Sequence, residues 1–116
     1  MRKFDSGATR DNDAGKLHYR RFFSPRVLKR RAQYMETHRI QADGVARDPD
    51  NWKKGIPLDA YADSAWRHHH EFWQLLDEGQ SSGPEIEEAI CALMFNLEGY
   101  LDTILREENP INRDTI

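Results

Sequence analysis

Apolar residues recur at helical spacing in three stretches of the sequence, and each stretch predicts a helix. The first covers residues 24–38, where Ser24 fits an N-cap and Pro25 fits the first helical position. The second covers residues 58–79, and the third covers residues 84–107. The predicted fold is therefore all-α, with three main helices in an up-down bundle.

The apolar faces of the last two predicted helices define the expected core. His69 falls on the apolar stripe of residues 58–79, which favours a hydrogen-bonded core histidine over a metal ligand. Ser82 and Glu85 fit a capping box at the start of the third helix. That helix has an apolar face broad enough to contact two neighbours. We therefore expect a partner chain to complete the bundle.

The segments between and beyond these helices are rich in turn residues. Residues 1–16 are interpreted as a mobile arm that ends in a turn at Asp13-Ala14-Gly15-Lys16. Residues 17–23 hold aromatic side chains that should pack on a core or a partner. Residues 40–57 form a long loop, and long loops in small domains are usually functional or disordered. Residues 108–116 are expected to form a polar tail.

Length, charge and cysteine content limit the class of protein. At 116 residues the chain is expected to fold as one domain, residues 1–116. Its formal net charge of −3 argues against a general nucleic-acid binder. No apolar run approaches the roughly 20 residues of a membrane span, and we recognise no signal peptide. Cys91 is the single cysteine, so we expect a core thiol and a cytoplasmic location.

An acidic cluster opens the third predicted helix and faces a histidine–acid pair on the second. Glu85 and Glu88 lie three apart, as do His68 and Glu71, so each pair shares one helix face. If the two helices pack antiparallel, the pairs meet and offer the ligands of a divalent-metal site. The alternative is that the acids only complement the helix dipole, which contributes about 0.3–1 kcal/mol for each charge.

Asn96 interrupts the apolar run of the third predicted helix, on the face that carries Glu88. A buried amide without partners costs a few kcal/mol, about 1–3 in proteins. Its presence therefore indicates a polar pocket inside the bundle.

The loop over residues 40–57 contains candidate nucleotide-binding residues. Four consecutive residues combine an amide, a stacking ring and two cations, namely Asn51, Trp52, Lys53 and Lys54. This set can contact a base and hold a phosphate, and the alternative is that Trp52 only anchors the loop to the helices. Lys16 and Arg67 are further candidate cations, although Lys16 fits a solvated tail equally well.

Three segments, in this order, resemble one known family. They are Asp13-Ala14-Gly15-Lys16, Asn51-Trp52-Lys53-Lys54-Gly55-Ile56-Pro57 and Trp66-Arg67-His68. They are similar to the phage dATP/dGTP diphosphohydrolase (N-terminal domain) family, which is related to the all-α, MazG-like nucleotide pyrophosphohydrolases.

The resemblance implies a homodimer or homotetramer that cleaves a (deoxy)nucleoside triphosphate to monophosphate and pyrophosphate with Mg²⁺ or Mn²⁺, purine deoxynucleotides being favoured. MazG-like enzymes carry two acidic pairs, each three apart, as metal ligands. Glu85 and Glu88 match the second pair, whereas the first pair is matched by His68 and Glu71. Catalytic roles then fall on His68, Glu71 and Glu88. Nucleotide-binding roles fall on Lys16, Asn51, Trp52, Lys53, Lys54, Arg67 and Asn96.

Two other functions stay open on the sequence alone. The first is a non-catalytic helical interaction or nucleotide-binding protein, whose acids only complement the helix dipole. The second is a nucleic-acid-binding module that uses the aromatics of residues 17–23 and a basic cluster formed by Arg26, Lys29, Arg30 and Arg31. A solvated face with a few ion pairs is the favoured interpretation of that cluster.

Overall fold

The computed structural model describes residues 1–12 and 14–108 and confirms the all-α fold class. Its elements are β1 (Arg2–Lys3), β2 (Thr9–Arg10), α1 (Tyr19–Phe22), α2 (Pro25–Thr37), the 3-10 helix η1 (Asn51–Lys54), α3 (Leu58–Asp77) and α4 (Pro84–Glu108). The three main helices are those predicted from the apolar pattern. Among the described residues, no helix is long and apolar enough to cross a membrane.

The beginnings of the helices follow from local chemistry. The Ser24 hydroxyl accepts a hydrogen bond from the Val27 amide at 3.2 Å, which confirms the predicted N-cap of α2. At α4 the N-cap differs by one residue from the predicted Ser82. Because α4 begins at Pro84, the cap position falls on Gly83, whose carbonyl accepts from the Glu87 amide at 3.2 Å. Ser82 lies one residue outside that position.

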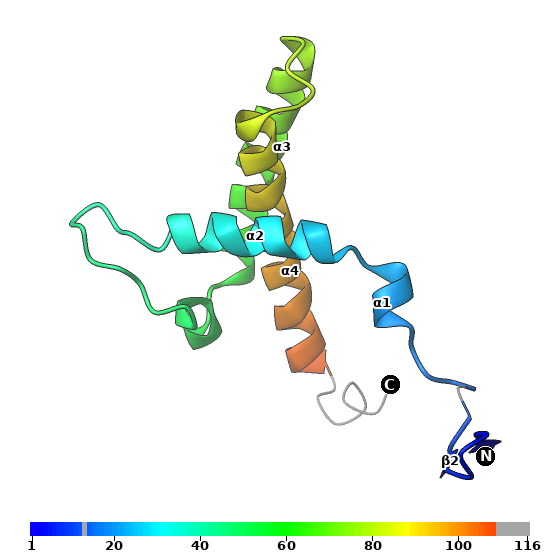
Figure 1. The fold of residues 1–116 in the computed structure, drawn as a ribbon. Coiled ribbons are helices and arrows are strands. Elements are labelled where there is room, and N and C mark those ends of the chain that lie inside the picture. The colour runs from blue at the N-terminus through cyan, green and yellow to red at the C-terminus, as the bar shows by residue number, and fades with distance from the viewer. Residues whose placement is uncertain (13, 109–116) are drawn as a thin grey trace.

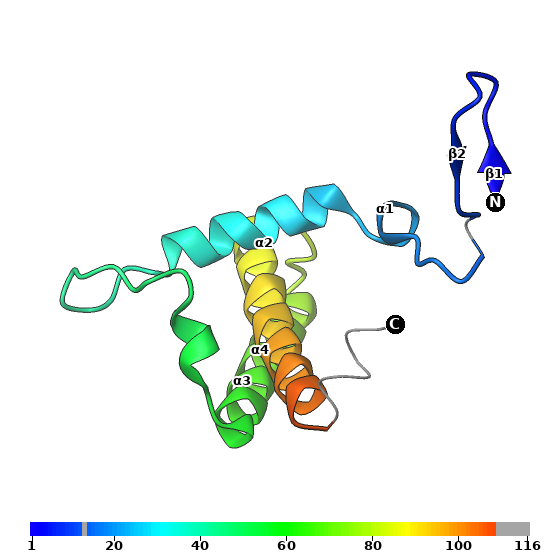
Figure 2. The ribbon, with the colours of Figure 1, turned by 90° about the horizontal axis from the view of Figure 1, so that it is seen from below.

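Helices α3 and α4 form an antiparallel pair, as predicted, and α2 crosses this pair (Figure 1). Seen from below, α2 lies along one side of the pair, and η1 lies beside the ends of α3 and α4 (Figure 2). The up-down arrangement therefore applies to α3 and α4, whereas α2 runs across them. This crossing brings α2 side chains over the first half of α4.

The core is small and lies between α3 and α4. Its buried apolar residues are Tyr61, Ile86, Ala89, Cys91 and Ala92. The burial of Cys91 confirms the prediction of a core thiol. Gly99 is essential to this packing, because a Cβ at that position would overlap the ring of Tyr61. The glycine therefore allows α3 to approach α4 closely.

Ion pairs and one indole ring attach α2 and the long loop to α4. Arg31 pairs with Glu98 at 3.0 Å. Trp52 is half-buried against Phe95, and the Arg106 guanidinium lies 5.6 Å from its ring centre. Trp52 thus anchors the loop, as one of its two interpretations predicted. Arg26 and Lys29 remain exposed, so the basic cluster is largely a solvated face with a few ion pairs.

The N-terminal segment lies apart from the helical body (Figure 1). Strands β1 and β2 pair antiparallel within the region predicted as an arm. Gly15 has a φ of +78°, as the predicted turn requires. The aromatics of residues 17–23 are exposed on this chain, with Phe22 at 76%. Asp13 and most of the predicted tail, residues 109–116, lie outside the described residues.

Candidate functional site

A cavity of about 500 Å³ lies where α2 crosses the antiparallel pair. Four of its lining residues are the predicted metal ligands His68, Glu71, Glu85 and Glu88. Tyr34 of α2 and His38, which follows α2, also line it, as do the polar side chains of Gln74 and Glu78. The antiparallel packing thus brings the two pairs to one cavity, as the sequence predicted. We call it the acidic cavity.

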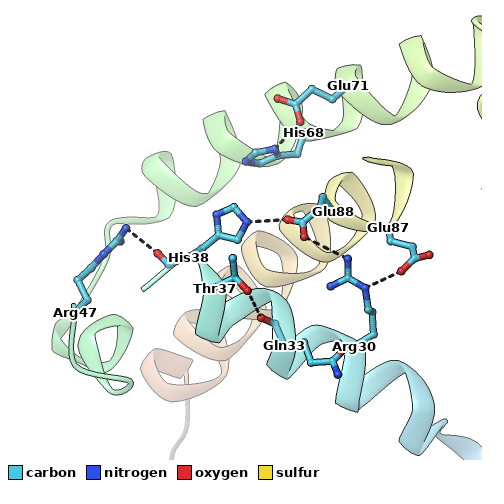
Figure 3. A network of polar contacts seen from close by, with 9 residues as sticks. All are labelled: Arg30, Gln33, Thr37, His38, Arg47, His68, Glu71, Glu87 and Glu88. Carbon is cyan, nitrogen blue, oxygen red and sulfur yellow. Dashed lines mark hydrogen bonds and ion pairs between the residues drawn. The ribbon is translucent and has the colours of Figure 1, made fainter. Parts of the chain in front are cut away.

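The carboxylate of Glu88 is held by Arg30 of α2 and by His38, the residue that caps the end of α2 (Figure 3). His38 Nε2 lies 2.7 Å from Glu88 Oε2, and Arg30 donates to Glu88 Oε1 at 3.3 Å. Arg30 also donates to Glu87 Oε1 at 2.7 Å. The stacked ring of Tyr34, 4.2 Å from that of His38 between centres, supports the imidazole. Glu88 therefore joins α2 to α4.

These contacts change the pKa of Glu88. Partial desolvation raises the pKa of this carboxyl, but hydrogen bonds from His38 and Arg30, with the charges of both, outweigh it, so the pKa lies below its ordinary value of 4.5. Glu88 is consequently ionised at neutral pH. The pKa of Tyr34 is raised, first by burial and then by the negative charge of Glu88. The phenol of Tyr34 therefore stays protonated.

On the opposite wall, His68 and Glu71 form a pair within α3 (Figure 3). His68 Nδ1 lies 3.1 Å from Glu71 Oε2, as expected for helix residues three apart. The His68 side chain is 27% exposed and that of Glu71 is 57% exposed. If Nδ1 carries the proton and donates to Glu71, then Nε2 keeps its lone pair and can act as a base.

A second cavity, of about 400 Å³, lies between α2 and the long loop. Trp52 and Asn51 line it together with apolar side chains such as Met35 and Phe95. Four charged side chains also line it, namely Glu36, Arg39, Arg47 and Asp48. His38 lines both this cavity and the acidic one, so the two are neighbours. We call it the loop cavity. An aromatic ring and an amide beside apolar side chains are features of a pocket for a flat heterocycle, and the charged side chains give this cavity a polar rim as well.

The predicted phosphate-binding cations do not gather at the acidic cavity. Lys53 pairs with Asp50 at 2.9 Å and lies over the ring of Trp52. Lys16, Lys54 and Arg67 are exposed, and they line neither the acidic nor the loop cavity of the described chain. No lysine or arginine lines the acidic cavity in the part of the chain that the structure describes.

Comparison with known families gives one match. The family model of dATP/dGTP diphosphohydrolase, N-terminal, matches residues 6–107. The chain belongs to the dATP/dGTP diphosphohydrolase N-terminal domain family. Neither the curated proteins nor the solved structures gave a significant match. Family membership agrees with the resemblance found in the sequence.

In nucleotide pyrophosphohydrolases of this kind a divalent metal is expected, and the cavity can be tested for one. The donors suit Mg²⁺ or Mn²⁺, since carboxylate oxygens dominate the set. Their positions do not form a ready centre: within residues 1–12 and 14–108, no three such side chains converge on a point. Arg30 and His38 already occupy the carboxylate of Glu88. Metal binding at this site therefore requires its side chains to move.

The predictions for Asn96 in α4 and His69 in α3 need correction. Asn96 is buried, as expected, but it donates to the Ala92 carbonyl at 2.8 Å and lines a mostly apolar groove. The expected polar pocket does not form, because the amide finds its partner one turn back in its own helix. His69 is exposed instead of forming part of the core, and it lines the same groove between α3 and α4.

His38 is the main residue of the acidic cavity that sequence reasoning missed. It lies 50 positions from Glu88, and a contact over that separation leaves no trace in local periodicity. One signal was available: His38 follows Tyr34 by four positions, so the two share a helix face.

Proposed function

We propose that this domain hydrolyses a purine (deoxy)nucleoside triphosphate to the monophosphate and pyrophosphate, with deoxynucleotides favoured and Mg²⁺ or Mn²⁺ required. The observation that best supports this proposal is the acidic cavity, which the paired residues of α3 and α4 line together. The chain also belongs to a diphosphohydrolase family. Under this proposal the acting form is a homodimer or homotetramer.

The charge of the cavity supports the metal requirement. Glu71, Glu85 and Glu88 line it, and no lysine or arginine of the described chain does so. A triphosphate would be repelled by these carboxylates unless cations accompany it. The proposed ligands of the ion are Glu71, Glu85 and Glu88, with His68 either as a fourth ligand or as the base, and a bound ion would supply neutralisation of phosphate charge.

The chemistry proposed for the chain itself is general base catalysis. Water attacks the α-phosphorus of the triphosphate, the bond from that phosphorus to the oxygen bridging the α- and β-phosphates breaks, and pyrophosphate leaves with that oxygen. His68 accepts the proton of the water at Nε2, while Glu71 fixes the ring through Nδ1. Glu88, on the facing wall, is proposed to hold the ion. The depressed pKa of Glu88 supports an ionised carboxylate there.

The loop cavity is the proposed base subsite. Trp52 offers a ring face and Asn51 offers an amide that can donate and accept. Because His38 lines both cavities, a nucleotide can place its base in the loop cavity and its phosphates at the acidic cavity. The remaining candidate cations could contact the nucleotide only from outside the two cavities; they are Lys16, Lys53, Lys54 and Arg67. Asn96 has no role in this arrangement.

The test is a product analysis. The protein is incubated with each common NTP and dNTP, with Mg²⁺, with Mn²⁺ or with EDTA, and the nucleotides are separated by anion-exchange chromatography. We expect purine deoxynucleoside monophosphate and pyrophosphate only with metal. Turnover that persists in EDTA would contradict the metal requirement, and release of orthophosphate would contradict the bond assignment.

A second function, nucleotide or protein binding without hydrolysis, is favoured by one observation. The carboxylate of Glu88 is engaged by Arg30 and His38, as expected for an acid that holds α2 in place. Absence of turnover with every nucleotide would support this second function. A thermal-shift screen with the same nucleotides would then show whether the two cavities bind them.

A further inference from the structure

The acidic cavity carries negative charge, and Arg30 of α2 lies next to one of its carboxylates. Arg30 donates to Glu88 Oε1 at 3.3 Å, and Glu88 lines the cavity. Arg30 itself does not line the cavity, nor does any other lysine or arginine of the described chain. A triphosphate carries more negative charge than one divalent ion neutralises, so the proposed reaction also needs a cation from the protein. Arg30 is placed to supply it.

Arg30 also has a hydrogen-bond donor that the fold leaves unused. Its Nε donates to Glu87 Oε1 at 2.7 Å, and its Nη2 donates to Glu88 (Figure 3). Its Nη1 makes no hydrogen bond to any residue within 1–12 and 14–108. The side chain is 28% exposed, so it packs on the helices and still has an accessible edge. A guanidinium with free N–H groups pairs with two phosphate oxygens at once.

The two carboxylates that hold Arg30 are not equivalent. Glu87 makes the shorter contact and does not line the acidic cavity, whereas Glu88 makes the longer one and does. Under the proposed function Glu88 is a ligand of the divalent ion. Its carboxylate then shares its charge with that ion, which weakens its attraction for the guanidinium. Arg30 can keep its contact with Glu87 while Nη1 and Nη2 become available beside the cavity.

Arg31, the next residue of α2, provides a matched comparison. It also pairs with a glutamate of α4, Glu98, at 3.0 Å. Consecutive helix residues point about 100° apart, and Arg31 lines neither the acidic nor the loop cavity. Both arginines therefore attach α2 to α4 through an ion pair, but the partner of Arg31 is not a residue of the acidic cavity.

We propose that Arg30 is a phosphate-binding residue of this site. Glu88 holds the guanidinium in the free protein, and Arg30 pairs with a phosphate of the triphosphate once Glu88 binds the divalent ion. The inference rests on the proposed function for the triphosphate and for the ion at Glu88. Its consequence is that the positive charge reaches the phosphates only when the ion is present, so the nucleotide binds weakly without metal.

The test measures binding without turnover. Isothermal titration calorimetry is run with the α,β-imido analogues of dATP and dGTP, which resist cleavage at the proposed bond. The full chain is compared with Arg30→Gln and with Arg31→Gln as the control. With Mg²⁺, Arg30→Gln should bind about 10–100-fold more weakly than the wild type, the effect of a lost hydrogen bond to a charged group. Arg31→Gln should bind as the wild type does. In EDTA, Arg30→Gln and the wild type should bind equally weakly.

Three results would overturn the inference. They are an unchanged affinity in Arg30→Gln with Mg²⁺, an equal loss in Arg31→Gln, and a loss of the same size in EDTA. Turnover of dATP or dGTP beside an unchanged affinity in Arg30→Gln would overturn the role of Arg30 and leave the proposed hydrolysis intact. A loss of affinity confined to Arg30→Gln, without turnover by the wild type, would support Arg30 as a phosphate ligand and count against hydrolysis.

Circular dichroism of each variant guards against misfolding. Glutamine is a good helix former, so α2 should remain helical in Arg30→Gln. If that variant does not fold, Arg30→Lys takes its place, because lysine keeps the positive charge that faces Glu87 and Glu88. A single ammonium lacks the planar fork of donors, so Arg30→Lys should still bind the analogues about 3–10-fold more weakly with Mg²⁺. Wild-type affinity in folded Arg30→Lys would then overturn the inference.

Discussion

Glu88 belongs both to the proposed catalytic wall and to the contact that holds α2 on α4. Its neighbour Glu87 provides a matched comparison, because it binds the same Arg30 but does not line the acidic cavity. We expect Glu88→Ala to lose about 100-fold or more in kcat/KM, as expected when a charged catalytic group is removed. Glu87→Ala should retain activity. The measurement is nucleotide turnover with Mg²⁺.

The stability of these two variants should differ little. Surface ion pairs contribute about 0–1 kcal/mol, and the Glu88 side chain is 40% exposed. Urea unfolding should therefore give similar midpoints for Glu87→Ala and Glu88→Ala. An equal loss of activity in both variants would show that Arg30 and not Glu88 is the important group.

The depressed pKa of Glu88 leads to a prediction for acid stability. A carboxyl whose folded pKa lies below 4.5 contributes stability above that value and loses it as pH falls through the folded pKa. Glu88→Gln removes this titration, so its melting temperature should fall less steeply between pH about 6 and about 3 than that of the wild type. Parallel curves for the two proteins would contradict the assignment.

At this scale the sequence predicted pairs within one helix and missed the contacts of Arg30 and His38 with α4. His68 and Glu71 were predicted together because three residues nearly complete a helical turn. The link from His38 to Glu88 depends on how α2 crosses α4, and local spacing carries no information on a crossing. The four candidate cations were predicted from residue type alone, and the structure does not gather them.

Among the elements, the α3–α4 pair depends on one close approach. Gly99 faces the ring of Tyr61, which is 2% exposed. Gly99→Ala should improve helix propensity by about 1 kcal/mol but overpack the contact by about 1–3 kcal/mol. We expect a net destabilisation, seen as a lower urea midpoint. A more stable Gly99→Ala protein would show that the ring moves aside freely.

A double mutant tests the cause of that destabilisation. Tyr61→Leu removes the ring that Gly99 accommodates. If the clash is responsible, Gly99→Ala should cost less in the Tyr61→Leu background than in the wild type. Additive costs would assign the effect to some other contact of α4.

The helices themselves were the most predictable elements. Serine and proline at residues 24–25, the glycines near residues 79–83 and the apolar repeats define their ends and faces without tertiary information. The small hairpin near the N-terminus was not foreseen, since its strands have two residues each and show no alternation. His69 was misplaced because an apolar stripe does not reveal which of two neighbouring faces meets the partner helix.

For the whole molecule, the two neighbouring cavities divide the proposed function. Under the proposal, the phosphate chemistry takes place at the acidic cavity and the base binds in the loop cavity, with His38 lining both. A change confined to the loop cavity should therefore alter nucleotide preference without altering the chemical step. Asn51 is suited to this test, because its side chain lines the loop cavity while Trp52 provides the anchor.

Asn51→Ala should raise KM for the preferred purine nucleotide about 3–10-fold, the effect of one lost hydrogen bond, with kcat unchanged. Gln41→Ala, an exposed substitution in the same loop that lines neither cavity, is the control. Initial rates with each purine and pyrimidine nucleotide give both constants. A fall in kcat with unchanged KM would indicate that the base does not bind in the loop cavity and that Asn51 lies beside the reacting phosphate. Equal KM changes for all bases would instead show that Asn51 contacts the sugar or phosphates.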